Sequence, residues 1–299
     1  MLTNFKKVIE EAKKLGLVTV SIAAAQDREV LEAVLDANKL GLIKAILVGD
    51  ENQIKPLFDE LGLSTCATII NEPDMDKAAL KASELVHNGE AQILMKGLIN
   101  SSNFLRAALD KEVGLRSGKI LSHFAAFEIP GEKKLAFHSD GGMNIAPSLE
   151  EKKQILVNAV EALNTMGIEK PNVAVLTANE QVNPKMSATV DAKELVDMWL
   201  NDEFPPCVVE GPIAMDVAAS AEAAKHKGIE SKIAGYVDFF LVPSIEAGNM
   251  VGKTLVNYAK AKIAGVILGA SNPIVMVSRS DNAEAKVNSI ALACLMTKR

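Results

Sequence analysis

The sequence has no excess of basic residues and few aromatic ones. Lysine and arginine together number 32, against 38 aspartate and glutamate residues, so the 299-residue chain has a net charge of −6. A protein that binds nucleic acid through its overall field is normally basic, and one that stacks single-stranded bases needs aromatic side chains, which make up only 4% here. We therefore expect no nucleic-acid partner, and any phosphate-bearing ligand must be held by a local site.

Cysteine is scarce, and long apolar runs are absent. The three cysteines, Cys66, Cys207 and Cys294, are odd in number, lie far apart and form no CxxC pair. A disulfide framework or a structural zinc site is therefore not expected, and reduced thiols fit a cytoplasmic protein. No apolar stretch reaches the roughly 18 residues that a membrane span needs. The first residues also lack the apolar core of a signal peptide, so we expect neither a membrane span nor export.

Several catalytic motifs are missing as well. The chain has no GxSxG of an α/β-hydrolase, no GxGxxG of a dinucleotide-binding dehydrogenase and no HExxH of a zinc enzyme. His123, His138 and Asp140 lack the spacing of metal ligands, and we interpret them as structural or cleft-lining. A GKT triplet stands at 252–254, but a P-loop would need glycine where Ala247 stands. The sequence therefore predicts no metal site and no ATPase.

Hydrophobic residues make up 48% of the chain, and their spacing alternates between that of strands and that of helices. Apolar runs at 18–24, 45–48, 67–70 and 92–96 predict buried strands, and the segments 28–40, 53–61 and 77–87 have helical spacing. This βαβ rhythm is typical of a parallel sheet covered on both faces, so the predicted fold class is α/β.

The rhythm is interrupted between residues 120 and 139, where two apolar runs flank a turn that contains Pro130 and Gly131. A capping box, SLEE at 148–151, then predicts a long helix to about residue 166. Further strands are expected at 173–177, 207–209, 237–242, 264–268 and 274–277, with helices at 188–200, 215–225, 248–262 and 283–296. We predict two α/β lobes with a hinge near residue 130.

In such sheets, ligands bind where strands end and helices begin, and three turns of this kind carry suitable side chains. In the first, a strand ends at Lys96 and Gly97, the loop carries Ser101 and Ser102, and Arg106 follows about one helical turn later. Hydroxyl groups and free N–H groups at a helix start suit an oxyanion, and arginine can hold phosphate bidentately. On the local sequence alone, Ser102 as an ordinary N-cap and Arg106 as a surface residue is the simpler interpretation.

The second turn, at 243–254, follows an apolar strand and contains Asn249 and Lys253. Its small residues allow both side chains to face a ligand, and the alternative is a tight turn with a solvated lysine. The third, at 274–284, brings Ser278 and Arg279 to the end of a buried strand, where arginine can hold phosphate and serine can donate to a developing oxyanion. In the structural alternative for its acidic residues, Asp281 is an N-cap and Glu284 the N3 acid of a capping box.

In this order the three turns resemble the phosphate acetyltransferase/butyryltransferase family over essentially the whole chain. Four segments carry the resemblance: GLINSSNFLR at 97–106, EGPIAMD at 210–216, PSIEAGN at 243–249 together with Lys253, and PIVMVSR at 273–279. The segments HSDGGMN at 138–144 and SRSDNAEAK at 278–286 are more similar to the butyryl branch than to the acetyl branch.

The resemblance implies two α/β lobes around a central cleft, the architecture of isocitrate and isopropylmalate dehydrogenases. The last helix would return to the first lobe, so the expected lobes are residues 1–129 with 275–299, and 130–274. The implied reaction is the reversible conversion of butyryl-CoA and phosphate to butyryl phosphate and CoA, with CoA and phosphate as substrates or products and no cofactor or metal. A cytoplasmic homo-oligomer is also implied.

The resemblance also assigns roles to residues of the three turns. Arg279 would hold phosphate or stabilise the leaving thiolate, and Ser278 would donate to the reacting centre. Ser101, Ser102 and Arg106 would help to bind phosphate and CoA, as would Asn249 and Lys253 from the second turn.

One position departs from the family pattern. Acetyltransferase members carry, seven residues after the serine that corresponds to Ser278, an aspartate proposed to act as a base, and here that position is Ala285. Glu284 and Asp281 are weak candidates for the base, because a helix turns by about 100° per residue and a neighbouring acid would point elsewhere. Another acid, the phosphate itself, or no discrete base are the remaining possibilities.

Three other functions stay open from the sequence. The same chemistry could act on acetyl-CoA or on short acyl chains in general, because one or two methylene groups provide only about 1–3 kcal/mol of discrimination. The implied architecture also occurs in dehydrogenases, although the chain shows no nicotinamide or metal-carboxylate pattern. A CoA or acyl-phosphate sensor without turnover is the third alternative, which the change to Ala285 permits and the presence of Ser278 and Arg279 opposes.

Overall fold

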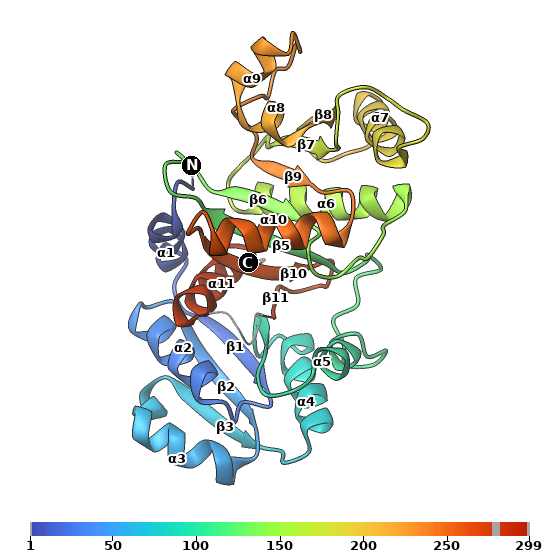
Figure 1. The fold of residues 1–299 in the computed structure, drawn as a ribbon. Helices are drawn as coiled ribbons and strands as arrows, with labels where there is room; N and C mark the ends of the chain where they lie inside the picture. Colours follow the sequence, from blue (N-terminus) through green and yellow to red (C-terminus); the bar gives the residue numbers. More distant parts are fainter. Residues whose placement is uncertain (1, 277–281, 298–299) are drawn as a thin grey trace. The chain divides into compact units, whose positions relative to one another are not determined.

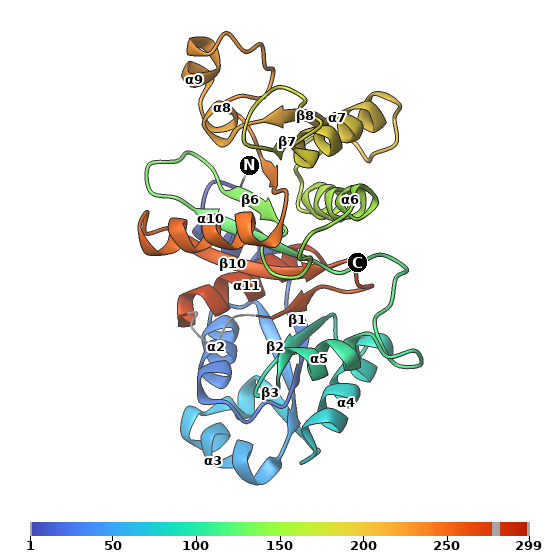
Figure 2. The ribbon, with the colours of Figure 1, turned by 45° about the vertical axis from the view of Figure 1, so that its right-hand side comes forward.

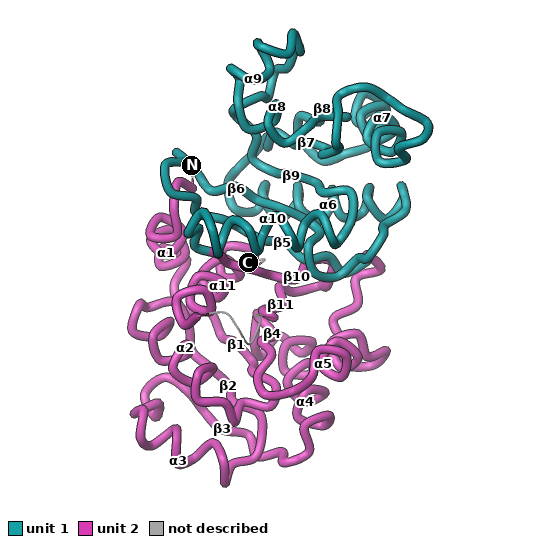
Figure 3. Tube along the Cα trace, in the orientation of Figure 1, with its two compact units in different colours: residues 1, 120–262 teal, residues 2–119, 263–299 magenta. Residues whose placement is uncertain are grey.

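The structure is a computed structural model that describes residues 2–276 and 282–297. Strands and helices alternate along most of the chain (Figures 1 and 2), which is the predicted α/β class. The chain forms two compact units (Figure 3). Unit 1 spans Ile120–Lys262, and unit 2 combines Leu2–Lys119 with Ile263–Arg299. These units divide the chain at other residues than the lobes expected from the sequence, and those lobes with their cleft stay a prediction.

Unit 2 contains a largely parallel sheet with strand order β3-β2-β1-β4-β11-β10, in which only β10 runs antiparallel to its neighbour β11. Its strands are β1 (Val18–Ala23), β2 (Ile43–Gly49), β3 (Ala67–Asn71), β4 (Ile93–Lys96), β10 (Lys262–Leu268, whose first residue belongs to unit 1) and β11 (Ile274–Val275). Its helices are α1 (Phe5–Lys14), α2 (Arg28–Lys39), α3 (Glu51–Leu61), the 3-10 helix η1 (Leu63–Thr65), α4 (Met75–His87), α5 (Ser101–Ala108) and α11 (Ala283–Leu295).

The first three strand-to-helix turns of unit 2 use the same local device. Each ends in an aspartate whose carboxylate accepts a hydrogen bond from a backbone N–H of the next helix: Asp27 before α2, Asp50 before α3 and Asp74 before α4. An aspartate at this position satisfies N–H groups that have no partner inside the helix and favours the positive end of the helix dipole. The caps therefore determine where each helix starts at the carboxyl edge of the sheet.

Helix α11 is buried on every side from Ala285 to Leu295. It packs against α1, α2 and β11 of unit 2. Its sequence is apolar all round rather than along one stripe, which is typical of a helix inside a core. Lys286, Asn288 and Ser289 are its buried polar residues, and the Lys286 ammonium group lies 2.7 Å from a carboxylate oxygen of Glu29 on α2.

Unit 1 contains the strand order β5-β6-β9-β7-β8, with β5 and β6 antiparallel and β6, β9, β7 and β8 parallel. Its strands are β5 (Ser122–Glu128), β6 (Ala136–Ser139), β7 (Asn172–Leu176), β8 (Val208–Ile213) and β9 (Phe239–Leu241). Its helices are α6 (Leu149–Thr165), α7 (Ser187–Leu200), α8 (Met215–Ala219), α9 (Ala221–His226) and α10 (Ile245–Asn257). The rings of Phe124 on β5 and Phe137 on β6 stack with their centroids 5.3 Å apart.

Most predicted elements are confirmed, including the capping box between Ser148 and Glu151 at the start of α6. Two predicted helices are wrong in extent. The helix expected at 215–225 is two helices, because Ser220 has an extended backbone and caps α9 with its own side chain. The helix expected at 248–262 is α10, which starts at Ile245 and ends at Asn257, and Lys262 already begins β10. Among the described residues no helix is both long and apolar enough to cross a membrane.

Candidate functional site

The turn between β4 and α5 is fastened to the turn between β1 and α2. The backbone N–H groups of Gly97 and Leu98 donate to the carbonyl oxygens of Ala23 and Ala24, at 2.9 and 2.7 Å. A Cβ atom on Gly97 would lie only 2.3 Å from the Ala24 oxygen, so no other residue fits without moving backbone. This close approach fixes the start of α5, where the first group of candidate residues lies.

Asn100, rather than Ser102, is the N-cap of α5. Its side-chain oxygen accepts hydrogen bonds from the Asn103 backbone N–H at 2.9 Å and from the Ser102 hydroxyl at 2.8 Å. Interpreting Ser102 as the cap is therefore wrong, because an amide oxygen one position before the helix already fills that role. Ser101 and Ser102 are the first two helical residues, and both are exposed.

Arg106 is exposed on the same helix, four residues after Ser102. Residues at this spacing lie on neighbouring turns of one helix face. The structure thus gathers Ser101, Ser102 and Arg106 on the first two turns of α5. The geometry suits an anion, because exposed hydroxyl groups, a guanidinium group and the positive end of a helix dipole all favour negative charge.

The third predicted turn begins at the same edge of the unit 2 sheet. Val275 of β11 is paired in parallel register with Met95 of β4, so both strands end side by side. Ser278, Arg279 and Asp281 lie outside the described residues. The N-cap of α11 is Asn282, whose side-chain oxygen accepts from the Ala285 N–H at 2.8 Å.

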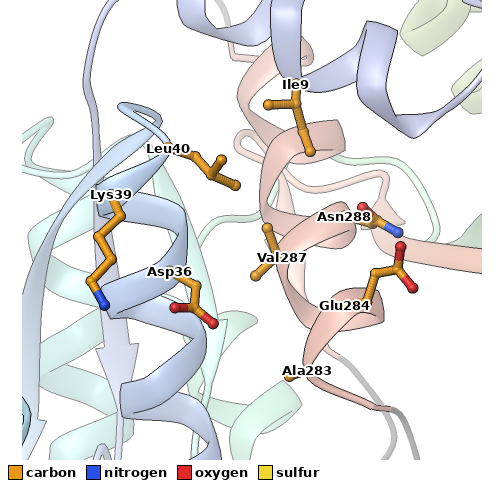
Figure 4. A pocket seen from close by; sticks show the side chains of 8 residues that line it. All are labelled: Ile9, Asp36, Lys39, Leu40, Ala283, Glu284, Val287 and Asn288. Carbon is orange, nitrogen blue, oxygen red and sulfur yellow. The ribbon is translucent and has the colours of Figure 1, made fainter.

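This cap moves Glu284 from the expected N3 position to N2, so the predicted capping box with Asp281 as its N-cap is wrong. Glu284 is exposed and helps to line a cavity of about 470 Å³ between α1, α2 and α11 (Figure 4). In that view Leu40, the residue directly after α2, and Val287 of α11 point toward each other, and Glu284 lies beside Asn288. The serines and the arginine of α5 do not line this cavity.

The second group of candidate residues lies in unit 1. Helix α10 starts beside the loop that follows β6, because β6 and β9 are parallel neighbours with Ser139 paired to Leu241. Asn249 and Lys253 are both exposed, one helical turn apart on α10, and the Asn249 amide donates to the Gly141 carbonyl at 3.3 Å. Lys253 is the ninth residue of this helix, so the GKT triplet lies inside a helix and not in a phosphate-binding loop before one.

Asp140 and His138, whose spacing does not fit metal ligands, have other contacts in the structure. Asp140 accepts five hydrogen bonds from N–H donors, and the described residues contain no group of three or more histidine, cysteine, aspartate or glutamate side chains that could hold a metal. His138 is buried between the rings of Phe127 and Phe240, at centroid distances of 5.1 and 4.9 Å. Burial lowers the pKa of His138 to about 4, since an apolar environment disfavours the imidazolium.

The buried imidazole makes the stability of the protein sensitive to acid. The folded-state pKa of His138 lies below its unfolded value of 6.5, so the unfolded chain binds the proton more readily. Above pH 6.5 the neutral imidazole of His138 contributes fully to the free energy of unfolding. As the pH falls from 6.5 toward 4, this free energy decreases by about 2–3 kcal/mol. We expect His138→Phe to flatten the free energy of unfolding over this range in urea titrations. The same change at exposed His226 should leave the slope unchanged, and equal slopes for all three proteins would contradict the assignment.

Two buried cysteines are poor candidates for nucleophiles. Burial raises the pKa of Cys207 to about 11 and also raises that of Cys66. A thiol reacts as its thiolate, and both groups are protonated near neutral pH. We therefore expect neither of these two thiols to act as a nucleophile.

Three residues that the sequence does not mark as site residues support the candidate side chains. Gly97 and Asn100 shape the turn before α5, and Asp140 shapes the loop beside α10. Asn100 has a residue type that commonly caps a helix, but Ser102 has a similar preference, so the sequence pattern does not choose between them. The roles of Gly97 and Asp140 depend in part on contacts with distant segments, at Ala23 and Ala24 for the glycine and at His123 for the aspartate, which the sequence does not show.

Comparison with known proteins gives a consistent result. A family model described as phosphate acetyl/butaryl transferase matches residues 65–294. The chain is 46% identical to the phosphate butyryltransferase of Clostridium acetobutylicum, over 99% of both chains. It is 40% identical to the phosphate acetyltransferase of Thermotoga maritima, over 97% of this chain and 98% of that protein.

Solved structures agree with these relatives. A branched-chain phosphotransacylase from Enterococcus faecalis superposes with a TM-score of 0.84 at 34% identity, covering 94% of this chain and all of that one. The fold is also similar to that of a putative 4-hydroxythreonine-4-phosphate dehydrogenase from Salmonella typhimurium, with a TM-score of 0.62 at 14% identity over 94% of this chain and all of that one. The latter similarity concerns the fold alone and agrees with the dehydrogenase-like architecture predicted from the sequence.

Proposed function

The chain belongs to the phosphate acetyl/butaryl transferase family, and we propose that it transfers a butyryl group reversibly between butyryl-CoA and inorganic phosphate. The products are butyryl phosphate and CoA. The observation that carries the proposal is the full-length similarity to a phosphate butyryltransferase at 46% identity. The butyryl-like segment at 138–144 supports it, because its residues form the loop that meets the first turn of α10.

In the proposed reaction a phosphate oxygen attacks the thioester carbonyl carbon in a ternary complex. The carbonyl oxygen becomes an oxyanion, the C–S bond then breaks, and CoA leaves as a thiolate that takes up a proton. Phosphate and the pyrophosphate of CoA are both anions, so the site must offset their repulsion. Arg279 would hold phosphate or stabilise the thiolate, and Ser278 would donate to the reacting centre. This chemistry needs neither a metal nor a cofactor.

The remaining candidates would bind the two anions. Ser101, Ser102 and Arg106 lie exposed at the start of α5, and Asn249 and Lys253 lie exposed on α10. No residue is assigned as the general base. Glu284 is an exposed carboxylate at the start of α11 and, with Asp281, stays a weak candidate. In the cell we expect a cytoplasmic homo-oligomer that takes part in butanoate metabolism.

A broad short-chain acyltransferase is the second candidate. A relative named phosphate acetyltransferase is 40% identical to this chain, nearly as similar as the butyryl enzymes at 41–46%. A branched-chain phosphotransacylase shares the fold at 34% identity. Acyl chain length alone gives weak discrimination, so activity on several chains is compatible with the same site.

The test is an assay of CoA release with acetyl-, propionyl-, butyryl-, isobutyryl- and valeryl-CoA, with and without phosphate. We expect phosphate-dependent release that is fastest with butyryl-CoA and unaffected by EDTA. A maximum with acetyl-CoA would retain the chemistry and overturn the butyryl preference. Absence of release with every thioester would overturn the proposal and favour a sensor, to be checked by CoA binding.

A further inference from the structure

The carboxylate of Asp140 is the centre of the loop that follows β6. The residue is only 2% exposed. One oxygen accepts from the backbone N–H groups of Gly142 and Met143, both at 2.8 Å. The other accepts from the backbone N–H of His123 at 3.0 Å, and from the backbone N–H and side-chain amide of Asn144 at 3.3 and 2.6 Å. One buried side chain thus holds three successive loop residues and the start of β5.

This carboxylate has no cationic partner among the residues that the structure describes. Its charge is stabilised by N–H dipoles alone, and hydrogen bonds to a charged acceptor are about twice as strong as neutral ones. Loss of the charge would therefore weaken all the bonds that hold the loop together. The proposed reaction gives Asp140 no contact with substrate. Contact with substrate therefore does not explain the five hydrogen bonds that this carboxylate accepts.

The loop held by Asp140 is in direct contact with the first turns of α10. The Ile245 N–H donates to the Ile145 carbonyl at 3.0 Å, and the Asn249 side-chain amide donates to the Gly141 carbonyl at 3.3 Å. Between these two points Gly141 and Gly248 meet backbone to backbone. A Cβ on Gly248 would lie 2.8 Å from the Gly141 Cα and 2.9 Å from the Asp140 carbonyl oxygen. The position of Asn249 therefore depends on the shape of the loop.

We propose that Asp140 is a positioning residue for substrate binding: through the loop at 141–145 it places the Asn249 amide and the first turn of α10. The inference rests on the proposed function, in which Asn249 binds phosphate or CoA. Asp140 acts through Gly141 and does not touch the reacting atoms. A displacement of an angstrom is enough to weaken such a contact strongly.

The first experiment compares Asp140→Asn with Asp238→Asn. Asp238 is a matched control because its carboxylate also accepts a backbone N–H, that of Asn172 at 2.8 Å, and a Lys134 ammonium hydrogen bond at 2.5 Å. It lies directly before β9, at the opposite end of that strand from α10. Hydrogen exchange read by mass spectrometry should show faster exchange at 141–146 and 245–250 in Asp140→Asn only. This readout does not depend on enzyme activity.

Steady-state kinetics give the second readout. We expect Asp140→Asn to raise, about tenfold, the KM of whichever substrate Asn249→Ala affects, with a smaller change in kcat. The two changes should not be additive in the double variant. Gly248→Ala, which pushes on the loop from the α10 side, should raise the same KM, whereas Asp238→Asn should change stability without changing either KM.

The outcomes separate this inference from the proposed function. If the wild-type protein releases no CoA, the proposed function fails, while the exchange data still report on the loop. If the wild type is active and Asp140→Asn keeps both KM values within twofold, or if Asn249→Ala affects neither substrate, the positioning role is overturned. Equal KM changes in Asp140→Asn and Asp238→Asn would also overturn it, because that pattern indicates a general loss of structure.

Discussion

Replacing Arg279 with alanine is expected to lower kcat/KM for phosphate-dependent CoA release by about a hundredfold or more. The proposed reaction brings two anions together and develops charge on an oxyanion and on a thiolate. A single guanidinium group can donate two parallel hydrogen bonds to phosphate and offset the repulsion, and alanine removes both effects. Arg279 lies outside the described residues, so this expectation rests on its place in the sequence, four residues after β11 ends beside β4.

Two further variants make the Arg279 test specific. Arg279→Lys retains the positive charge but lacks the planar guanidinium group that donates two parallel hydrogen bonds. Its kcat/KM should therefore lie between those of the wild type and the alanine variant. Arg116→Ala is the off-site control, since the Arg116 side chain donates to the Leu109 carbonyl at 2.6 Å within a structural loop. An alanine variant at 279 with kcat/KM within threefold of the wild type would remove this residue from the site.

Among the proposed substitutions, Gly97→Ala should produce the largest decrease in the free energy of unfolding. The new Cβ would lie 2.3 Å from the Ala24 oxygen and 2.6 Å from the Ala23 oxygen, and both atoms belong to the backbone of the neighbouring turn. Relief requires the turns after β1 and β4 to separate, which breaks the hydrogen bonds from Gly97 and Leu98. We expect the free energy of unfolding, measured in urea, to fall by about 4 kcal/mol.

The same change should also reduce activity, because the β4–α5 turn carries Ser101 and Ser102. Gly89→Ala is the matched control. Gly89 has a positive φ of 80° and no atom within 4 Å of the added Cβ, so it tests backbone strain without a clash. Its cost should be about 1 kcal/mol, with normal KM values. Equal losses of stability for the two variants would show that the close approach at Gly97 is not what requires glycine there.

The sequence alone was sufficient for features that depend on residues close together in the chain. Hydrophobic spacing identified β1 to β4 and the helices between them, and the pair Ser148 and Glu151 identified the start of α6. The stop after α4 was equally readable, since Asn88 caps the helix and Gly89 has a positive φ. Periodicity and capping act over three or four residues, so they are written into the local sequence.

Local patterns were less reliable where two neighbouring residues compete for one role. Asn100 rather than Ser102 caps α5, and Asn282 rather than Asp281 caps α11. Asparagine, aspartate and serine have similar intrinsic preferences for this position, so a sequence pattern does not rank them. The contacts of the preceding turn decide which residue has the extended backbone that a cap needs, as the hydrogen bonds from Gly97 to Ala23 and from Leu98 to Ala24 do for α5.

Only the tertiary structure decided which residues support the candidate site. Asp140 binds the N–H of His123 from another strand, and Gly141 meets Gly248, which lies 107 positions later in the chain. These contacts exist because β5, β6 and β9 are neighbours in one sheet, and strand order follows from the packing of the whole unit. A sequence shows which side chains could bind an anion, whereas hydrogen bonds and close contacts between distant segments determine where those side chains are held.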